Sequence, residues 1–115
     1  DEEGIYVVEN RLVKKVAFTR GGHFYKLRRA PQGGAPTLEV DGIHMHRIKE
    51  VSPWQDSILK VRAAKVKRGS RVLDVCTGLG YTASISIEFG ASEVLSIEVD
   101  PVVLEIAHKL RLAGL

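Results

Sequence analysis

The sequence contains very little of several residue types, and each shortage excludes a class of protein. A single cysteine among 115 residues excludes an internal disulfide framework and a zinc site built from cysteines. No run approaches the ~20 apolar residues of a membrane span, so no membrane partner is expected. An aromatic content of 6% is too low to indicate a base-stacking platform. With 44% hydrophobic and 27% charged residues, the chain is predicted to be globular and cytoplasmic.

Charge is spread unevenly along the chain. Residues 1–71 contain 15 Lys and Arg against 8 Asp and Glu, a balance of +7, whereas residues 72–115 contain 2 against 6, a balance of −4. One acid-free interval, residues 11–30, holds seven basic residues: Arg11, Lys14, Lys15, Arg20, Lys26, Arg28 and Arg29. Such an interval is typical of a polyanionic partner such as RNA or of an ordinary solvated face, and both interpretations stay open here.

The most informative stretch runs from residue 71 to residue 100. Two short apolar runs, residues 72–75 and 94–97, flank a segment of helical length that Gly90 ends. Apolar runs too short for helices, alternating with a helix, indicate parallel strands joined by a crossover. Gly78 and Gly80 lie where the first strand passes into the helix, and glycine there permits a positive φ and a close approach of a ligand. The stretch therefore predicts a strand–turn–helix–strand unit with a ligand at the turn.

Two nucleoside cofactors fit this unit. The spacing Gly78-x-Gly80-x-x-Ala83 matches the dinucleotide fingerprint. Asp74, however, ends the first strand, and a carboxylate there suits a ligand that carries an ammonium and a sulfonium but is unfavourable beside a pyrophosphate. Glu98 follows Gly78 by 20 positions and ends the second strand, where a carboxylate accepts hydrogen bonds from ribose hydroxyls. Asp74 therefore favours S-adenosyl-L-methionine over NAD.

Two motifs support that preference by resemblance. The run Asp74-Val-Cys-Thr-Gly-Leu-Gly80 resembles the first motif of class I S-adenosylmethionine-dependent methyltransferases, with Cys76 in place of the first of three glycines. Residues 96–103 are similar to the second motif, particularly in spermidine synthases and in uncharacterised archaeal methyltransferases related to them. The resemblance implies an α/β fold with a partial Rossmann-like, doubly wound sheet. It implies these cofactor-binding residues: Asp74, Cys76, Thr77, Gly78, Gly80, Tyr81, Glu98 and Val99.

The resemblance also implies a role for several of these residues. Asp74 would face the methionine ammonium, directly or through water, and Glu98 would hold the ribose hydroxyls. Val99 would pack against adenine, and Gly78 and Gly80 would let the backbone approach the cofactor. Cys76 is interpreted as a small structural thiol rather than a nucleophile, and no catalytic base is assigned.

The remaining elements are predicted from turns and helix caps. Residues 1–50 are expected to form a small antiparallel β unit behind a frayed acidic end, with a strong two-residue hairpin signal at Asp41-Gly42. Residues 51–115 are expected to be the amino-terminal portion of the Rossmann-like domain. Strands are expected over residues 5–8, 12–18 and 23–27. The buried face of the first helix is expected to carry Ile58, Leu59, Ala63 and Val66, and that of the last helix Val103, Leu104, Ala107 and Leu110. His44 and His46 face the same way but lack a third ligand, so no metal site is predicted.

The chain lacks the substrate-side motif of the methyltransferases that it resembles, often Asn or Asp followed by Pro-Pro and an aromatic residue. The leading hypothesis is therefore the cofactor-binding part of a methyltransferase with an unidentified acceptor. The alternatives are an aminopropyltransferase, although its turn usually ends Gly-Asp-Gly-Gly, a dinucleotide-dependent oxidoreductase, or a non-catalytic nucleoside- or RNA-binding module. Because two parallel strands make a poor independent sheet, the chain is expected to self-associate or to pack on the rest of a longer polypeptide.

Overall fold

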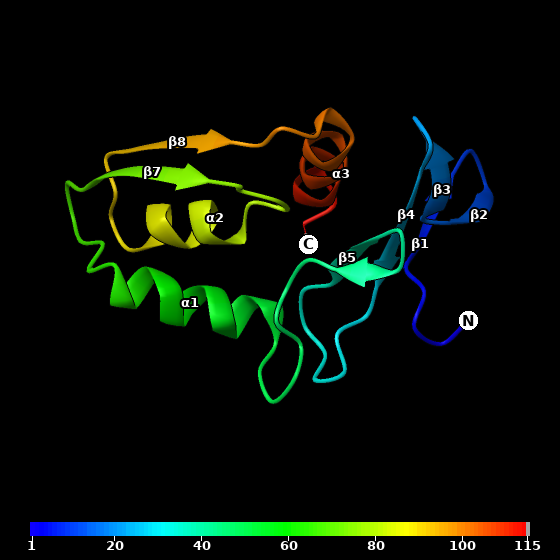
Figure 1. Ribbon diagram of the computed structural model, residues 1–115, viewed down its shortest axis with the longest axis horizontal. Helices are drawn as coiled ribbons and strands as arrows, with labels where there is room; N and C mark the ends of the chain where they lie inside the picture. Colours follow the sequence, from blue (N-terminus) through cyan, green and yellow to red (C-terminus); the bar gives the residue numbers. More distant parts are fainter. Residues whose placement is uncertain (115) are drawn as a thin grey trace. The chain divides into compact units, whose positions relative to one another are not determined.

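The computed structural model describes residues 1–114 and shows an α/β protein made of two compact units. The first unit spans Asp1–Pro53 and the second begins at Trp54 (Figure 1). The first contains antiparallel strands, and the second contains most of the helical residues together with one parallel pair of strands.

The first unit contains two antiparallel sheets. Its strands are β1 (Tyr6–Glu9), β2 (Leu12–Lys15), β3 (Ala17–Arg20), β4 (His23–Arg28), β5 (Thr37–Val40) and β6 (Ile43–His44). β1 pairs with β2 alone, and β3 to β6 form a four-stranded meander in chain order. The single strand expected over residues 12–18 is wrong, because Val16 separates two strands. Its N–H donates to the carbonyl of Ile5, the residue before β1, and its carbonyl accepts from the Leu27 N–H of β4.

The predicted hairpin at Asp41-Gly42 is confirmed. Asp41 and Gly42 have φ of 53° and 82°, as a two-residue turn between right-twisted strands requires. Leu27 and Leu38 are opposite each other in the β4–β5 register, and both are fully buried. Nearby, the rings of Phe18 and Tyr25 stack with centroids 5.5 Å apart. The core of this unit therefore lies on one face of the meander.

The second unit contains the predicted strand–turn–helix–strand arrangement. Its elements are α1 (Pro53–Ala63), β7 (Arg71–Val75), α2 (Tyr81–Glu88), β8 (Glu93–Ile97) and α3 (Pro101–Leu112). β7 and β8 pair in parallel, from Arg71 opposite Glu93 to Val75 opposite Ile97. Gly90 has φ of 99°, and a Cβ there would lie 2.8 Å from Arg68 Cα, so the loop after α2 needs glycine. Within residues 1–114 this pair is the whole parallel sheet, not the doubly wound sheet that the resemblance implies.

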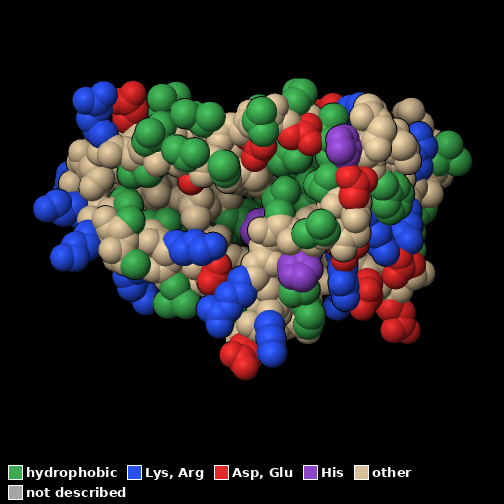
Figure 2. Space-filling model, in the orientation of Figure 1, with side chains coloured by type: hydrophobic (Ala, Val, Ile, Leu, Met, Phe, Trp, Pro, Cys, Tyr) green, Lys and Arg blue, Asp and Glu red, His purple; other side chains and the backbone are tan. Residues whose placement is uncertain are grey.

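The two faces of the parallel pair differ in exposure. Asp74 bonds to Thr82 of α2, so the alternation of side chains along a strand puts Val72 and Val94 on the helix-covered face. The opposite face carries Leu73 (59% exposed), Val75 (61%), Leu95 (59%) and Ile97 (48%). Hydrophobic side chains gather over this part of the molecule in Figure 2. This apolar sheet face is uncovered by any of the described residues.

The helical faces were only partly predicted. Asp100 caps α3 by accepting from the Val102 N–H at 2.9 Å, and Pro101 is the first helical residue. The buried positions of α3 are Val103, Ile106 and Leu110, so the expectation of Leu104 is wrong. In α1, Val61 is buried and Leu59 is exposed, which reverses part of the predicted face. Among residues 1–114, no helix has the length and apolarity to span a bilayer.

Candidate cofactor site

The candidate site lies at the carboxyl ends of β7 and β8. Both strands point the same way, so the loop into α2 and the loop into α3 leave from the same edge (Figure 1). The Thr77 N–H donates to the Ile97 carbonyl at 3.0 Å and extends the pairing one step past the strands. The Gly80 N–H donates back to the Thr77 carbonyl at 2.8 Å and closes the turn before α2. Residues from two separate motifs are thus brought together.

Glu98 joins the two loops through its carboxylate. Its Oε1 atom accepts from the Gly78 N–H at 2.9 Å, and its Oε2 atom accepts from the Asp100 N–H at 3.1 Å. Each carboxylate oxygen has a second lone pair, so the group can still accept hydrogen bonds from a ligand. Val99 follows directly and is 94% exposed, which leaves an apolar surface beside the carboxylate.

Asp74 is held by two threonine hydroxyls. Thr77 Oγ1 donates to Asp74 Oδ2 at 2.5 Å, and Thr82 Oγ1 lies 2.8 Å from Oδ2 and 3.0 Å from Oδ1. Thr77 was among the predicted site residues, but Thr82 was not. No local motif marks Thr82, because it meets Asp74 only when the first turn of α2 packs at the end of β7.

The turn itself adopts left-handed backbone at three of its positions. Cys76 has φ of 59°, Gly78 has 56° and Gly80 has 83°. The turn forms with Cys76 in place of the first glycine, but the cysteine occupies a backbone region that L-residues with a Cβ adopt at a cost. The thiol is exposed at this edge.

Tyr81 begins α2, and the side chain of Arg111 from α3 reaches the same helix. Tyr81 is only 5% exposed, and its ring meets that of Trp54 edge-on with centroids 5.6 Å apart. Burial raises the pKa of the Tyr81 hydroxyl. Tyr81 therefore offers little surface to a ligand. Arg111, which the sequence did not single out, reaches from α3 to Ser84 Oγ at 3.3 Å and lies 3.2 Å from where a Cβ on Gly80 would be.

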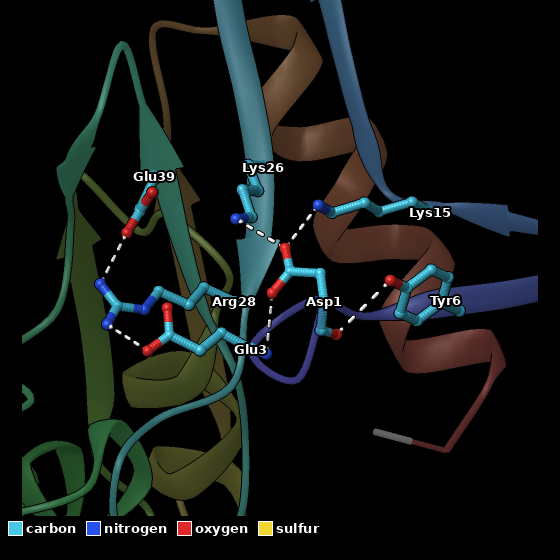
Figure 3. A network of polar contacts seen from close by, with 7 residues as sticks. All are labelled: Asp1, Glu3, Tyr6, Lys15, Lys26, Arg28 and Glu39. Carbon is cyan, nitrogen blue, oxygen red and sulfur yellow. Dashed lines mark hydrogen bonds and ion pairs between the residues drawn. The ribbon is translucent and has the colours of Figure 1, made fainter.

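The basic run of the first unit is partly neutralised by the amino-terminal acids (Figure 3). Asp1 pairs with Lys15 and, at 3.0 Å, with Lys26. Arg28 donates to Glu39 at 2.9 Å and to Glu3 at 3.1 Å, and the hydrogen bond to Glu39 is the main cause that raises its pKa. The amino-terminal segment is therefore bound to β2 and β4, contrary to the expectation of a frayed end.

The unpaired cations of the run are fewer than the sequence indicates. Within residues 1–114, no carboxylate pairs with Arg11, Lys14 or Arg29. Within the described chain, the two histidines considered as metal ligands gain no third ligand. His46 Nδ1 lies 2.8 Å from Thr37 Oγ1, and among the described residues no three His, Cys, Asp or Glu side chains lie close enough together to hold a metal ion.

Comparison with known proteins gives two similarities of different extent. The chain is 46% identical over 107 residues to an uncharacterized protein of Methanocaldococcus jannaschii, covering 93% of the chain and 35% of that protein. It is 48% identical over 44 residues to a ribosomal protein L11 methyltransferase of Symbiobacterium thermophilum, covering 38% of the chain and 14% of that enzyme. No family model matches the chain. The chain thus spans about a third or less of the length of these curated relatives.

Proposed function

We propose that the second unit binds S-adenosyl-L-methionine at the ends of β7 and β8 and is the cofactor-binding part of a methyltransferase. The observation that carries the proposal is the Glu98 carboxylate, which bonds to Gly78 across the two loops and lies beside the exposed Val99. A carboxylate that spans the loops suits two vicinal ribose hydroxyls, and an exposed apolar side chain next to it suits an adenine face. The similarity to a ribosomal protein L11 methyltransferase supports the same class of reaction.

The charge and hydrogen bonding of the turn favour this cofactor over a dinucleotide. A pyrophosphate at a strand–helix turn needs free backbone N–H groups. Here the Gly78 N–H already donates to Glu98, and Asp74 adds a second carboxylate nearby. Two negative groups repel a pyrophosphate but attract a ligand that carries an ammonium and a sulfonium. The residues present therefore fit S-adenosyl-L-methionine.

The chemistry assigned to this chain is binding and orientation. Glu98 would hold the ribose, Val99 would pack on adenine, and Asp74 would attract the methionine ammonium. The left-handed turn from Cys76 to Gly80 would bring backbone close to the cofactor. When bound, the cofactor supplies an electrophilic methyl group, so alignment with the acceptor is the main requirement for transfer. A general base and the acceptor-binding residues would come from other polypeptide, and the Rossmann-like sheet would be completed there.

Titration calorimetry tests the proposal directly. The chain should bind S-adenosyl-L-methionine or its demethylated product more tightly than NAD. Binding of NAD alone would support a dinucleotide-dependent oxidoreductase, and preference for decarboxylated S-adenosylmethionine would support an aminopropyltransferase. Absence of binding to all of these ligands would contradict a nucleoside site at this turn.

We also propose, as a second candidate, that the first unit contacts RNA through its unpaired cations. Arg11, Lys14 and Arg29 remain without a carboxylate partner within residues 1–114, whereas Lys15 and Lys26 of the same run form ion pairs with Asp1. Phosphate contacts of this kind position a nucleic acid without reading its sequence.

A further inference from the structure

The hydroxyl of Thr82 touches both oxygens of the Asp74 carboxylate, at 3.0 Å and 2.8 Å. Thr77 adds a second hydroxyl at 2.5 Å from Oδ2. The three side chains come from β7, from the turn and from the first turn of α2. We infer that Thr82 is a positioning residue that fixes Asp74 for recognition of a ligand ammonium. This inference rests on the proposed function.

The direction of the hydrogen bonds makes this cluster an acceptor site. An ionised carboxylate has no proton to give, so both threonine hydroxyls must donate to it. Their protons are thereby committed to Asp74, and the hydroxyl oxygens present only lone pairs to a ligand. A primary ammonium has three donors and no acceptor, so it suits such a cluster, whereas a carboxylate or phosphate finds no donor there.

Thr82 fixes the plane of the carboxylate. The last torsion of an aspartate side chain has a broad energy profile and does not set the plane by itself. A hydroxyl close to both oxygens holds that plane at the end of β7. Thr82 is itself held, because its carbonyl accepts from Ser86 Oγ at 2.8 Å and Ser86 is buried. Removal of the Thr82 hydroxyl leaves only the Thr77 bond to Oδ2, so the carboxylate plane should be less well fixed while the helix stays in place.

The test compares two ligands that differ only in the amino-acid part. S-adenosylhomocysteine carries the ammonium, whereas methylthioadenosine keeps the adenosine and sulfur but has no ammonium. In Thr82→Val the affinity for S-adenosylhomocysteine should fall about tenfold, as expected for loss of order at a charged hydrogen-bonding group, and the affinity for methylthioadenosine should stay the same. Thr82→Ser, which keeps the hydroxyl, should restore the ratio of the two affinities. Ser84→Ala is the matched control, since Ser84 lies in the same helix and bonds to Arg111 instead.

The pairing with Asp74 gives a second measurement. If Thr82 acts through Asp74, then adding Thr82→Val to Asp74→Asn should cause no further loss of S-adenosylhomocysteine affinity. An equal loss of affinity for both ligands in Thr82→Val, or no change in either affinity, would overturn the inference. In that case, binding of S-adenosylhomocysteine by the wild type would still support the proposed function. Failure of the wild-type chain to bind either ligand would overturn both. Should Thr82→Val fail to fold by circular dichroism, Thr82→Ala, with its higher helix propensity, gives the same two-ligand ratio.

Discussion

Glu98 Oε1 accepts a hydrogen bond from the Gly78 N–H at 2.9 Å, across 20 positions of sequence. Through this bond and the one from the Asp100 N–H, a single side chain both orders two loops and faces the proposed ribose position. Its replacement should therefore affect stability as well as binding, so the two effects need to be measured separately.

Glu98→Ala should weaken binding of S-adenosyl-L-methionine at least tenfold, because two hydrogen bonds from ribose hydroxyls to a carboxylate are lost. The same variant should lower the free energy of unfolding by about 1–2 kcal/mol, since the Gly78 and Asp100 N–H groups lose their acceptor. Calorimetry and urea denaturation measure the two quantities. Glu93→Ala, at the opposite end of β8 and paired with exposed Arg71, should change neither by a comparable amount. Unchanged cofactor affinity in Glu98→Ala would contradict the ribose assignment.

Cys76→Gly should stabilise the chain. Cys76 has φ of 59°, and a residue with a Cβ pays about 1–2 kcal/mol for that region. Glycine avoids this cost but loses more entropy on folding, so a net gain of about 0.5–1 kcal/mol in unfolding free energy is expected. Cys76→Ala keeps the Cβ and should be nearly neutral, whereas β-branched Cys76→Val should destabilise. Thermal and urea denaturation of the three variants gives the order, and a loss of stability in Cys76→Gly would mean that the thiol makes a stabilising contact.

The strand–turn–helix–strand unit was predictable because its signals are local. Glycines, the Asp100-Pro101 cap and alternating apolar runs each act within a few residues of chain. The position of the candidate site was predictable to the same extent, because Asp74 lies next to the last residue of β7, Glu98 directly follows β8, and parallel strands end at a common edge. The hydrogen bonds that those two carboxylates make could not be predicted from the local sequence pattern.

The contacts and buried positions that the sequence did not predict are those that depend on tertiary packing. Thr82 meets Asp74 only after α2 packs, and Lys15 meets Asp1 only after the amino-terminal segment folds onto β2. In α1 the buried positions include polar Asp56 and Ser57, so a face chosen from hydrophobicity alone is only partly correct. The break at Val16 follows from pairing with two different partners, which no strand propensity encodes.

The Asp41 carboxylate should make the first unit sensitive to acid. His23 Nδ1 lies 2.6 Å from Asp41 Oδ2, and the Phe24 N–H donates to Oδ1 at 2.8 Å. The hydrogen bond with His23, followed by that from Phe24, lowers the pKa of Asp41 below its usual 3.8. Because the folded pKa is below the unfolded one, the contribution to stability is present above pH 3.8 and is lost as the pH falls through the folded value.

Asp41→Asn isolates that contribution, since asparagine keeps the left-handed turn but does not ionise. The difference in urea midpoint between the wild type and Asp41→Asn should be largest near about pH 5 and smallest near about pH 2. Glu2→Gln changes the same charge at an exposed position without a hydrogen-bond partner in the described chain and should not alter this dependence. A difference independent of pH would show that the turn conformation, not ionisation, sets the effect.

Binding of RNA to the first unit should depend on the three unpaired cations. Reversal of Arg11, Lys14 and Arg29 to Glu should abolish binding and flatten the dependence of log affinity on log salt, because each phosphate contact contributes about −0.7 to that slope for a single strand. Reversal of Lys15 and Lys26 removes partners of Asp1 and should act mainly on stability. Fluorescence anisotropy with a single-stranded RNA at several salt concentrations measures the slope. Binding that ignores both salt and the triple reversal would exclude an electrostatic interface.

We propose that the 115-residue chain associates with itself through the apolar sheet face of β7 and β8. Leu73 lies opposite Leu95 and Val75 opposite Ile97, so four exposed apolar side chains form one contiguous patch. An uncovered face and edge of this kind promote association. In a longer polypeptide, such as the archaeal relative, further segments are the alternative cover for the same face.

The association should weaken when charge is placed on the patch. The double variant Leu73→Lys and Leu95→Lys should be monomeric at concentrations where the wild type is not, because two desolvated ammonium groups oppose burial of the face. Leu59→Lys is the matched control, since Leu59 is similarly exposed on α1 but lies outside the sheet. Light scattering across a dilution series separates the cases. A wild type that remains monomeric throughout, or an association that the double variant leaves unchanged, would show that this face is not the contact.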